Sequence, residues 1–354
     1  MQTNIIQHTE EWHSAKLGSI GGSRIGSLVQ YYCAEEVLKY FPVLAEESFF
    51  STPFEIFVEM KHGVRVDNDE RSSDERNTLE YGTKMEKYAV YRANKEYCMI
   101  AKYEGTASFW ENKEINKYAT CSPDGFVELF GEKQNFGTDE KINSTYGKGL
   151  LEIKTSQYGV NFENELPFQY ILQLQWNMLI TGCKWGSLFV LLPKNKEGDE
   201  LYNKGRKVAL AGINQLEILN SELNAKEWCY TENKPLQQLC ILAIQRFEVA
   251  LCRKEYPILS SNATKNKRER VLLRHLKPSV YGEREAINGE NELINQRMKL
   301  DKEIKEMEKH KLEIDNKLLT SLQESEKIVA DDYTVSRKIN QKSISLLFRK
   351  TNFN

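Results

Sequence analysis

The chain has 354 residues, of which 40% are hydrophobic and 28% are charged. This length and composition allow a sizeable buried core in one to three domains, and they exclude a disordered or fibrous protein. The formal net charge of −2 also excludes attraction of nucleic acid by the charge of the whole molecule. A nucleic-acid partner would therefore have to be held by local basic patches.

The N-terminus has no cationic stretch followed by an apolar segment of signal-peptide length. The densest apolar run, residues 188–192, is far shorter than the roughly 20 residues that cross a bilayer. We therefore expect a cytoplasmic protein, in the host cytoplasm if a virus encodes it, with no membrane partner. The 7 cysteines lie without the close pairs typical of zinc or iron–sulfur sites, so we expect them to be mostly reduced and structural.

In chain order, the first predicted elements are a helix over residues 11–18, a glycine turn and the start of a second helix near residue 23. Residues 31–78 favour helices and end in a polar segment, residues 67–77, that is typical of an exposed loop. The pattern over residues 79–192 then alternates between helix and strand, which predicts an α/β core. Its predicted elements are helix 79–97, strands ending near residue 127 and over 150–154, helix 168–181 and strand 187–192. Helices are predicted to continue over residues 214–256.

The last hundred residues change in character. Residues 253–277 carry a local excess of six positive charges, which could contact a phosphate backbone or form a solvated linker. Apolar residues then recur every seven positions at Leu293, Leu300, Met307 and Ile314. They predict a helix that could pair in a hairpin, in a dimer or with another protein, although Arg297 and Lys311 at core positions oppose a long stable coiled coil. Residues 333–338 predict a short terminal strand.

The central chemical signal is Asp124, followed downstream by Glu152-Ile153-Lys154. Because side chains alternate along a strand, Glu152 and Lys154 share one face. Magnesium prefers oxygen ligands, which Asp124, Glu152 and the Ile153 carbonyl could supply. Lys154 could then hold or polarise an attacking water. Such a short pattern also occurs in ordinary surface residues.

Two predicted helices add polar groups to this signal. Glu86 lies in a stripe of small and apolar residues, where a carboxylate is costly unless a metal or a rotated, exposed face compensates it. Gln169, Gln173 and Asn177 follow one another at four-residue spacing, which suits binding of phosphate or metal-bound water but also suits a solvated face. After two glycines, Ser23 could cap a helix whose N-terminus favours an anion such as phosphate.

Taken together, these residues occur in the order of a known group of enzymes. The chain resembles the PD-(D/E)xK nuclease superfamily and, more narrowly, the lambda exonuclease and YqaJ-type viral recombinase family. The narrower resemblance covers about residues 10–195. It rests on Trp12 with Lys16-Leu17-Gly18, on Gly22-Ser23, on Tyr81-Gly82 before Glu86, on Thr120-Cys121-Ser122-Pro123-Asp124-Gly125, and on Tyr170-Ile171-Leu172-Gln173-Leu174-Gln175.

The resemblance implies an α/β (α+β) fold with a restriction-endonuclease-like core, in which helices flank a central mixed sheet. A C-terminal helical extension, able to form a coiled coil, would follow. The expected domains are a nuclease domain over residues 1–252, a basic linker over 253–290, and the heptad helix with a short terminal strand over 291–354.

The resemblance also implies roles for single residues. Glu86, Asp124 and Glu152 would coordinate Mg²⁺, or Mn²⁺ in its place, together with Ile153. Lys154 would position water and Gln173 would donate hydrogen bonds in the active site. Lys16 and Ser23 would contact DNA phosphate.

The implied function is a magnesium-dependent deoxyribonuclease that degrades double-stranded DNA ends from 5′ to 3′ in phage-type homologous recombination. Expected partners are DNA ends, a single-strand annealing protein and further copies of the chain. One alternative is a structure-specific or sequence-specific endonuclease of the same superfamily. Another is a non-catalytic scaffold that binds DNA ends. A zinc-dependent hydrolase fits less well, because the histidines form no ligand-spaced pair.

The sequence departs from the family in three ways. Lys16 stands where the family commonly has arginine. An arginine can donate two parallel hydrogen bonds to a phosphate, whereas a lysine acts as a point charge. Glu152 follows Asp124 by 28 residues, with residues 131–147 as a polar insertion that has the pattern of a long hairpin or loop. The chain beyond about residue 260 lies outside the resemblance.

Overall fold

The computed structural model describes residues 2–3, 5, 9–63, 73–96, 99–103, 109–155, 166–193, 223–261, 263–275, 289–322, 327–329, 333–340 and 343–350. The chain divides into two compact units, residues 1–277 and residues 278–354, and each is considered by itself. The domain limits expected from the sequence stay a prediction.

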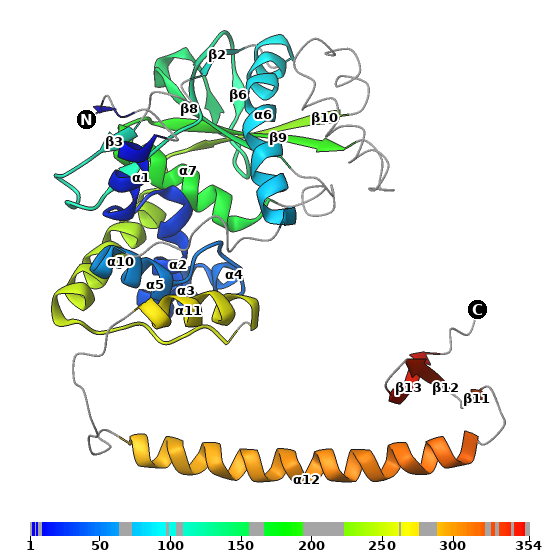
Figure 1. Ribbon diagram of the computed structural model, residues 1–354. Coiled ribbons are helices and arrows are strands. Elements are labelled where there is room, and N and C mark those ends of the chain that lie inside the picture. The colour runs from blue at the N-terminus through cyan, green and yellow to red at the C-terminus, as the bar shows by residue number, and fades with distance from the viewer. Residues whose placement is uncertain are drawn as a thin grey trace. The chain divides into compact units, whose positions relative to one another are not determined.

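The first unit begins with short helices around the predicted glycine turn (Figure 1). They are α1 (Glu10–Leu17), α2 (Gly22–Tyr32), α3 (Ala34–Tyr40), α4 (Pro42–Ala45) and α5 (Pro53–His62). The predicted helix–turn–helix at the start is confirmed. Helix α5 starts with a capping box between Thr52 and Glu55 and ends at Gly63, whose φ of 64° suits glycine.

The polar segment expected to form a loop begins a helix instead. Helix α6 spans Ser73–Glu96, so the expectation is wrong for residues 73–77, while residues 67–72 lie outside the described part of the chain. Polar residues without apolar partners are as typical of a helix N-terminus as of a loop, and the sequence pattern does not separate the two.

A five-stranded mixed sheet forms the centre of the first unit, in the order β10-β9-β8-β5-β2. Its strands are β2 (Met99–Tyr103), β5 (Gly125–Leu129), β8 (Gly149–Thr155), β9 (Trp185–Pro193) and β10 (Leu223–Thr231). Strands β8 and β9 are parallel, and α7 (Phe168–Thr181) lies between them in the chain, as a crossover connection requires. The predicted mixed sheet flanked by helices is confirmed. A smaller sheet joins β1 (Gln2–Thr3), β3 (Phe109–Glu111) and β4 (Thr120–Cys121).

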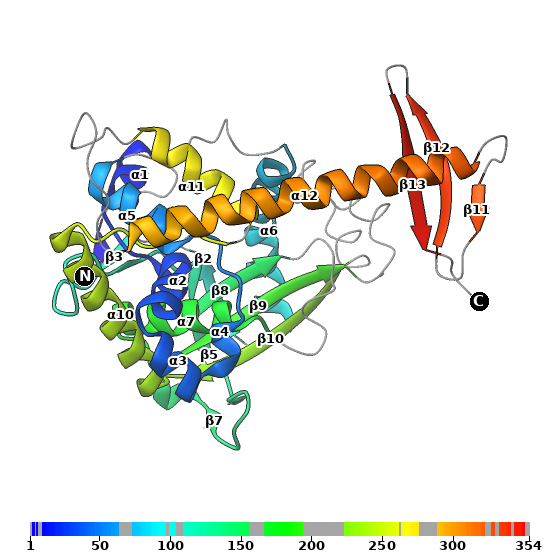
Figure 2. The same ribbon diagram turned by 90° about the horizontal axis from the view of Figure 1, so that it is seen from below.

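Helices cover both faces of the central sheet (Figures 1 and 2). The side chains of strand β8 point alternately to these two faces. Leu151 and Ile153 pack in a core cluster with residues of α6 such as Met85 and Ala89. Leu150 packs in another cluster with Leu174 of α7. The alternation predicted for this strand is therefore present, and it leaves Glu152 and Lys154 on the α7 side.

The region after β9 differs from the helical prediction. Residues 223–231 form strand β10, which pairs with all of β9 in antiparallel register. The helix-favouring residues Ala225, Lys226 and Glu227 lie in this strand because its pairing with β9 outweighs their helix propensity. Glu227 also forms an ion pair with Lys133 at 2.6 Å and accepts a hydrogen bond from Ser187 at 2.8 Å. Helix α10 (Lys234–Arg253) follows and agrees with the prediction.

The polar insertion forms a hairpin of β6 (Lys133–Gln134) and β7 (Lys141–Ile142), followed by the 3-10 helix η2 (Ser144–Tyr146). Asn135, which is 5% exposed, fastens it to β10. Its Nδ2 donates to Thr231 Oγ1 at 2.9 Å, and the Thr231 amide donates back to its Oδ1 at 3.1 Å.

Part of the basic stretch forms helix α11 (Ala263–His275), which packs beside α5 in both ribbon views. Leu272 of α11 is buried with Phe54 and Val58 of α5. Glu269 is fully buried and accepts hydrogen bonds from Thr52 Oγ1 at 2.5 Å and from the Ser260 amide at 2.7 Å. This segment of α11 is thus packed against protein.

The second unit holds α12 (Glu290–Leu322) and a three-stranded antiparallel sheet of β11 (Lys327–Val329), β12 (Tyr333–Asn340) and β13 (Ser343–Lys350). The predicted heptad helix and terminal strand are both present. The heptad residues Leu293, Leu300 and Met307 are 64%, 53% and 64% exposed. Within the described ranges, no helix is long and apolar enough to cross a membrane.

Candidate active site

The two charged residues of strand β8 form a buried ion pair. Lys154 Nζ lies 2.6 Å from Glu152 Oε1, and the two side chains are 18% and 2% exposed. The sheet brings them together on its α7 side, as their alternation predicts.

Helix α7 holds both oxygens of the Glu152 carboxylate. Gln173 Nε2 donates to Oε1 at 2.5 Å, and Asn177 Nδ2 donates to Oε2 at 3.0 Å. Asn177 is 1% exposed. The helix face that carries Gln169, Gln173 and Asn177 is therefore not solvated at Asn177. The four-residue spacing of Gln173 and Asn177 predicts amides on one side of the helix, and in the structure both amides bind Glu152.

Asp124 lies just before strand β5 and is tied to β8 through its backbone. Its Oδ2 accepts a hydrogen bond from the Ile153 amide at 2.7 Å. Burial raises the pKa of Asp124 well above its ordinary value, and the negative charges of Glu152 and Glu86 raise it further. Glu86 comes from α6, on the other side of the sheet from Glu152, and it influences the site through Asp124.

The chemistry of these donors fits a divalent cation that prefers oxygen ligands, because Asp124 lies close enough to the carboxylates of Glu152 and Glu86 for both of their charges to raise its pKa. As the side chains stand, however, no set of three or more His, Cys, Asp or Glu in the described ranges is grouped closely enough to hold a metal ion. The hydrogen bonds from Lys154, Gln173 and Asn177 occupy the Glu152 carboxylate. A bound cation would have to share these oxygens.

Lys154 remains a cation in this setting. Burial lowers its pKa, but the charges of Glu152 and Asp124 more than offset that effect, and the net pKa lies above the ordinary value. The ammonium also lies 5.1 Å from the ring centre of Tyr170 in α7. A charged ammonium can donate hydrogen bonds to a water or a phosphate oxygen, and it cannot take a proton from either.

The N-terminal motif lies beside the Asp124 segment. Trp12 Nε1 donates to Ser122 Oγ at 3.4 Å, and Lys16 Nζ lies 4.4 Å from the centre of the Trp12 ring. Lys16 is thus brought near the segment that carries Asp124.

Ser23 does not cap helix α2, contrary to the prediction. Gly21 occupies the N-cap position and no side chain caps the helix. Ser23 is the second helical residue because the helix begins at Gly22, two residues earlier than a cap at Ser23 requires. The start of α2 lies against α7, since a Cβ on Gly22 would lie 2.6 Å from Asn177 Oδ1 and 2.8 Å from Gln173 Cγ.

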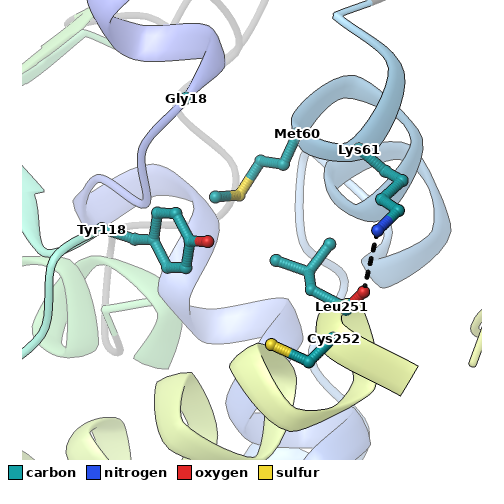
Figure 3. Close-up of a pocket in the computed structure, with 6 residues that line it drawn as sticks. All are labelled: Gly18, Met60, Lys61, Tyr118, Leu251 and Cys252. Carbon is teal, nitrogen blue, oxygen red and sulfur yellow. Dashed lines mark hydrogen bonds between the residues drawn. The ribbon is translucent and has the colours of Figure 1, made fainter. Parts of the chain in front are cut away.

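A separate pocket of about 330 Å³ lies among α1, α5 and α10 (Figure 3). It is lined by Gly18, Met60, Lys61, Tyr118, Leu251 and Cys252. Lys61 Nζ donates to the Leu251 carbonyl at 3.2 Å across one side of it. None of the predicted site residues lines this pocket.

A comparison with models of known protein families agrees with the family expected from the sequence. A family model described as the YqaJ-like viral recombinase domain matches residues 11–184. The fold is similar to an alkaline exonuclease from Laribacter hongkongensis, at 18% identity over 70% of this chain and 94% of that chain, with a TM-score of 0.42. The complex of that enzyme with dAMP matches at 16% identity over 70% and 96%, with a TM-score of 0.41.

A phage-related exonuclease from Haemophilus somnus 129PT matches at 11% identity over 67% of this chain and 94% of that chain, with a TM-score of 0.40. No curated protein matches the chain.

Proposed function

Because residues 11–184 belong to the YqaJ-like viral recombinase domain family, we propose that this protein is a nuclease that hydrolyses phosphodiester bonds at the ends of double-stranded DNA. The observation that carries the proposal is the arrangement on β8. Glu152 and Lys154 share a buried face, and Asp124 is fixed beside them by the Ile153 amide.

The proposed cofactor is Mg²⁺, with Mn²⁺ able to replace it. Asp124 and Glu152, with Glu86, would hold the ion, and the Ile153 carbonyl stays a proposed further ligand. When bound, such an ion lowers the pKa of water and neutralises charge on phosphate.

The side chains contribute the rest of the proposed chemistry. Lys154 orients a water or a phosphate oxygen by donating to it, since its raised pKa keeps it protonated. Gln173 and Asn177 fix the direction of the Glu152 carboxylate. The uncapped N-terminus of α2 lies against these two amides and supports phosphate contact by the segment that carries Ser23. Lys16, held over Trp12, is a second proposed phosphate contact.

The proposed direction is 5′ to 3′, in phage-type recombination with a single-strand annealing protein. The exposed apolar seam of α12 supports association with that partner or with further copies of the chain, because such a surface is usually covered in use. Arg297 forms an ion pair with Asp301 of the same helix, which partly offsets the free-energy cost of placing a cation in this apolar seam.

The test is digestion of end-labelled linear duplex DNA and of closed-circular DNA, with Mg²⁺ or with EDTA. Wild type should release the 5′ label from linear DNA only with Mg²⁺, and Lys154→Ala should abolish release. Lys141→Ala is a matched control, because Lys141 also pairs with a glutamate, Glu132 at 2.8 Å, but is 62% exposed. Cleavage of circles would favour an endonuclease, and binding without cleavage would favour a scaffold.

A further inference from the structure

A pair of aromatic rings leads away from Lys154 towards the surface. The Tyr170 ring centre lies 5.1 Å from Lys154 Nζ, and the Phe50 ring centre lies 6.4 Å from that of Tyr170, with 39° between the planes. Tyr170 is partly buried, whereas Phe50 is 58% exposed. The second ring therefore offers an exposed apolar surface one ring away from Lys154.

The chain positions Phe50 by burying its neighbour. Phe49 is 5% exposed and packs in the core, where its ring lies so close to Gly26 that no side chain fits at that glycine. Phe49 thus anchors the loop of residues 46–51, which we name the Phe50 loop, and Phe50 is left outside the core.

Polar contacts from three directions hold the Phe50 loop. Gln30 Nε2 donates to the Glu47 carbonyl at 2.9 Å, and the Glu47 carboxylate accepts from the Gln169 amide of α7 at 3.5 Å. From α11, Arg268 donates to the Phe50 carbonyl at 2.8 Å and Lys265 to Ser48 Oγ at 3.2 Å. A loop fixed in this way presents its exposed ring with little cost in ordering on binding.

The α11 contacts also bring positive charge to the same surface. Arg268 pairs with Glu55 at 2.9 Å, Lys265 donates to Ser48 Oγ at 3.2 Å, and Arg270 is exposed. Aromatic rings beside basic side chains are the combination that binds single-stranded nucleic acid, because bases stack on the rings and cations face the phosphates.

We infer that Tyr170 and Phe50 form a stacking platform for an unpaired nucleobase adjacent to the phosphodiester at Lys154. This inference rests on the proposed function, since it takes DNA as the ligand. Stacking is tolerant of sequence, so the platform accepts any base. A single exposed phenylalanine is ordinary on a protein surface, and it is the contact of this one with Tyr170, which itself lies beside Lys154, that points to a ligand.

The test measures binding in EDTA, by fluorescence anisotropy, to duplexes with a short single-stranded extension of either polarity. The extension carries either normal bases or abasic sugars. Phe50→Ala should weaken binding of the base-containing extension of one polarity about tenfold, within the range for stacking of one base. Phe50→Trp should restore binding. Phe130→Ala, which removes a ring that is 63% exposed at the end of β5, should bind as wild type does.

The abasic substrates separate stacking from loop structure. Wild type should bind the abasic extension about as weakly as Phe50→Ala binds the normal one, and combining the two changes should cause no further loss. Unchanged binding by Phe50→Ala, or an equal loss on normal and abasic DNA, would overturn the platform.

The two proposals can fail separately. Magnesium-dependent cleavage by wild type, with base-independent binding in every variant, would leave the nuclease standing and remove the platform. Base-dependent binding through Phe50 without any cleavage would support the platform and remove the nuclease.

Discussion

A single methyl group at Gly22 should disturb the Glu152 carboxylate through α7. In Gly22→Ala the new Cβ would lie 2.6 Å from Asn177 Oδ1 and 2.8 Å from Gln173 Cγ. Asn177 is 1% exposed and has little space into which to move. Since its Nδ2 and the Gln173 Nε2 hold the two oxygens of Glu152, the substitution should turn or shift that carboxylate.

The expected loss of stability is modest and the expected loss of activity is larger. Overpacking a buried contact costs about 1–3 kcal/mol, and replacing a helical glycine by alanine returns about 0.5–1 kcal/mol. The free energy of unfolding should therefore fall by about 1 kcal/mol, which lowers Tm by roughly 2–4 °C. A displacement of about 1 Å at a reacting group can cost about 100-fold in rate, so we expect cleavage to slow by roughly 10- to 100-fold.

Thermal unfolding and initial rates on linear duplex DNA measure the two effects. Gly18→Ala is the control, because this glycine of the same motif has nothing within 4 Å of its Cβ position. It should change Tm and rate little. If Gly22→Ala cleaved as fast as Gly18→Ala, the contact of α2 with α7 would have no part in holding Glu152, and the reasoning would be refuted.

Three further predictions concern the hairpin insertion, the buried Glu55 and the association of the chain. Asn135→Ala should lower the free energy of unfolding by about 2 kcal/mol and speed hydrogen exchange of the Thr231 amide, with unchanged cleavage, because it frees the insertion from β10. Burial raises the pKa of Glu55 above its ordinary value, although the charge of Arg268 lowers it in part. Arg268→Gln removes that charge. The substitution should lower the free energy of unfolding, measured by urea titration, by about 2 kcal/mol at pH 8. This loss should shrink as the pH falls through the raised pKa of Glu55, because the protonated carboxyl no longer attracts a cation. A pH-independent cost would contradict this. A chain ending at Lys277 should still unfold cooperatively and cleave linear DNA but should sediment as a monomer, since it lacks α12; dimers of the shortened chain would place association elsewhere.

The elements with a strong hydrophobic period were predictable from the sequence. Helix α7 has the predicted limits, and β8 and β9 lie within one or two residues of theirs. The alternation of Leu151, Glu152, Ile153 and Lys154 also correctly placed the two charges on one face. These features depend on side chains a few residues apart, which a linear pattern records.

The features that depend on contacts distant in sequence could not be predicted. Residues 223–231 look helical, yet they pair with β9 along their whole length, and Glu227 forms an ion pair with Lys133 of the β6–β7 hairpin. The register at the start of α2, which gives the N-cap to Gly21 rather than Ser23, is fixed by close packing against α7. The role of Asn177 as a donor to Glu152 required the position of α7 over β8.

The pairing of β5 with β8 separates the geometry of the site from the length of chain that connects its parts. Gly125 pairs with Leu151 and Val127 with Gly149, so Asp124 and Glu152 are set by strand register, whatever the insertion between them contains. Evolution can lengthen, shorten or decorate that hairpin without moving either carboxylate. Searches that demand a fixed spacing between the two carboxylates would overlook such relatives, and protein engineers could splice a fluorescent reporter or a surface tether into the same turn.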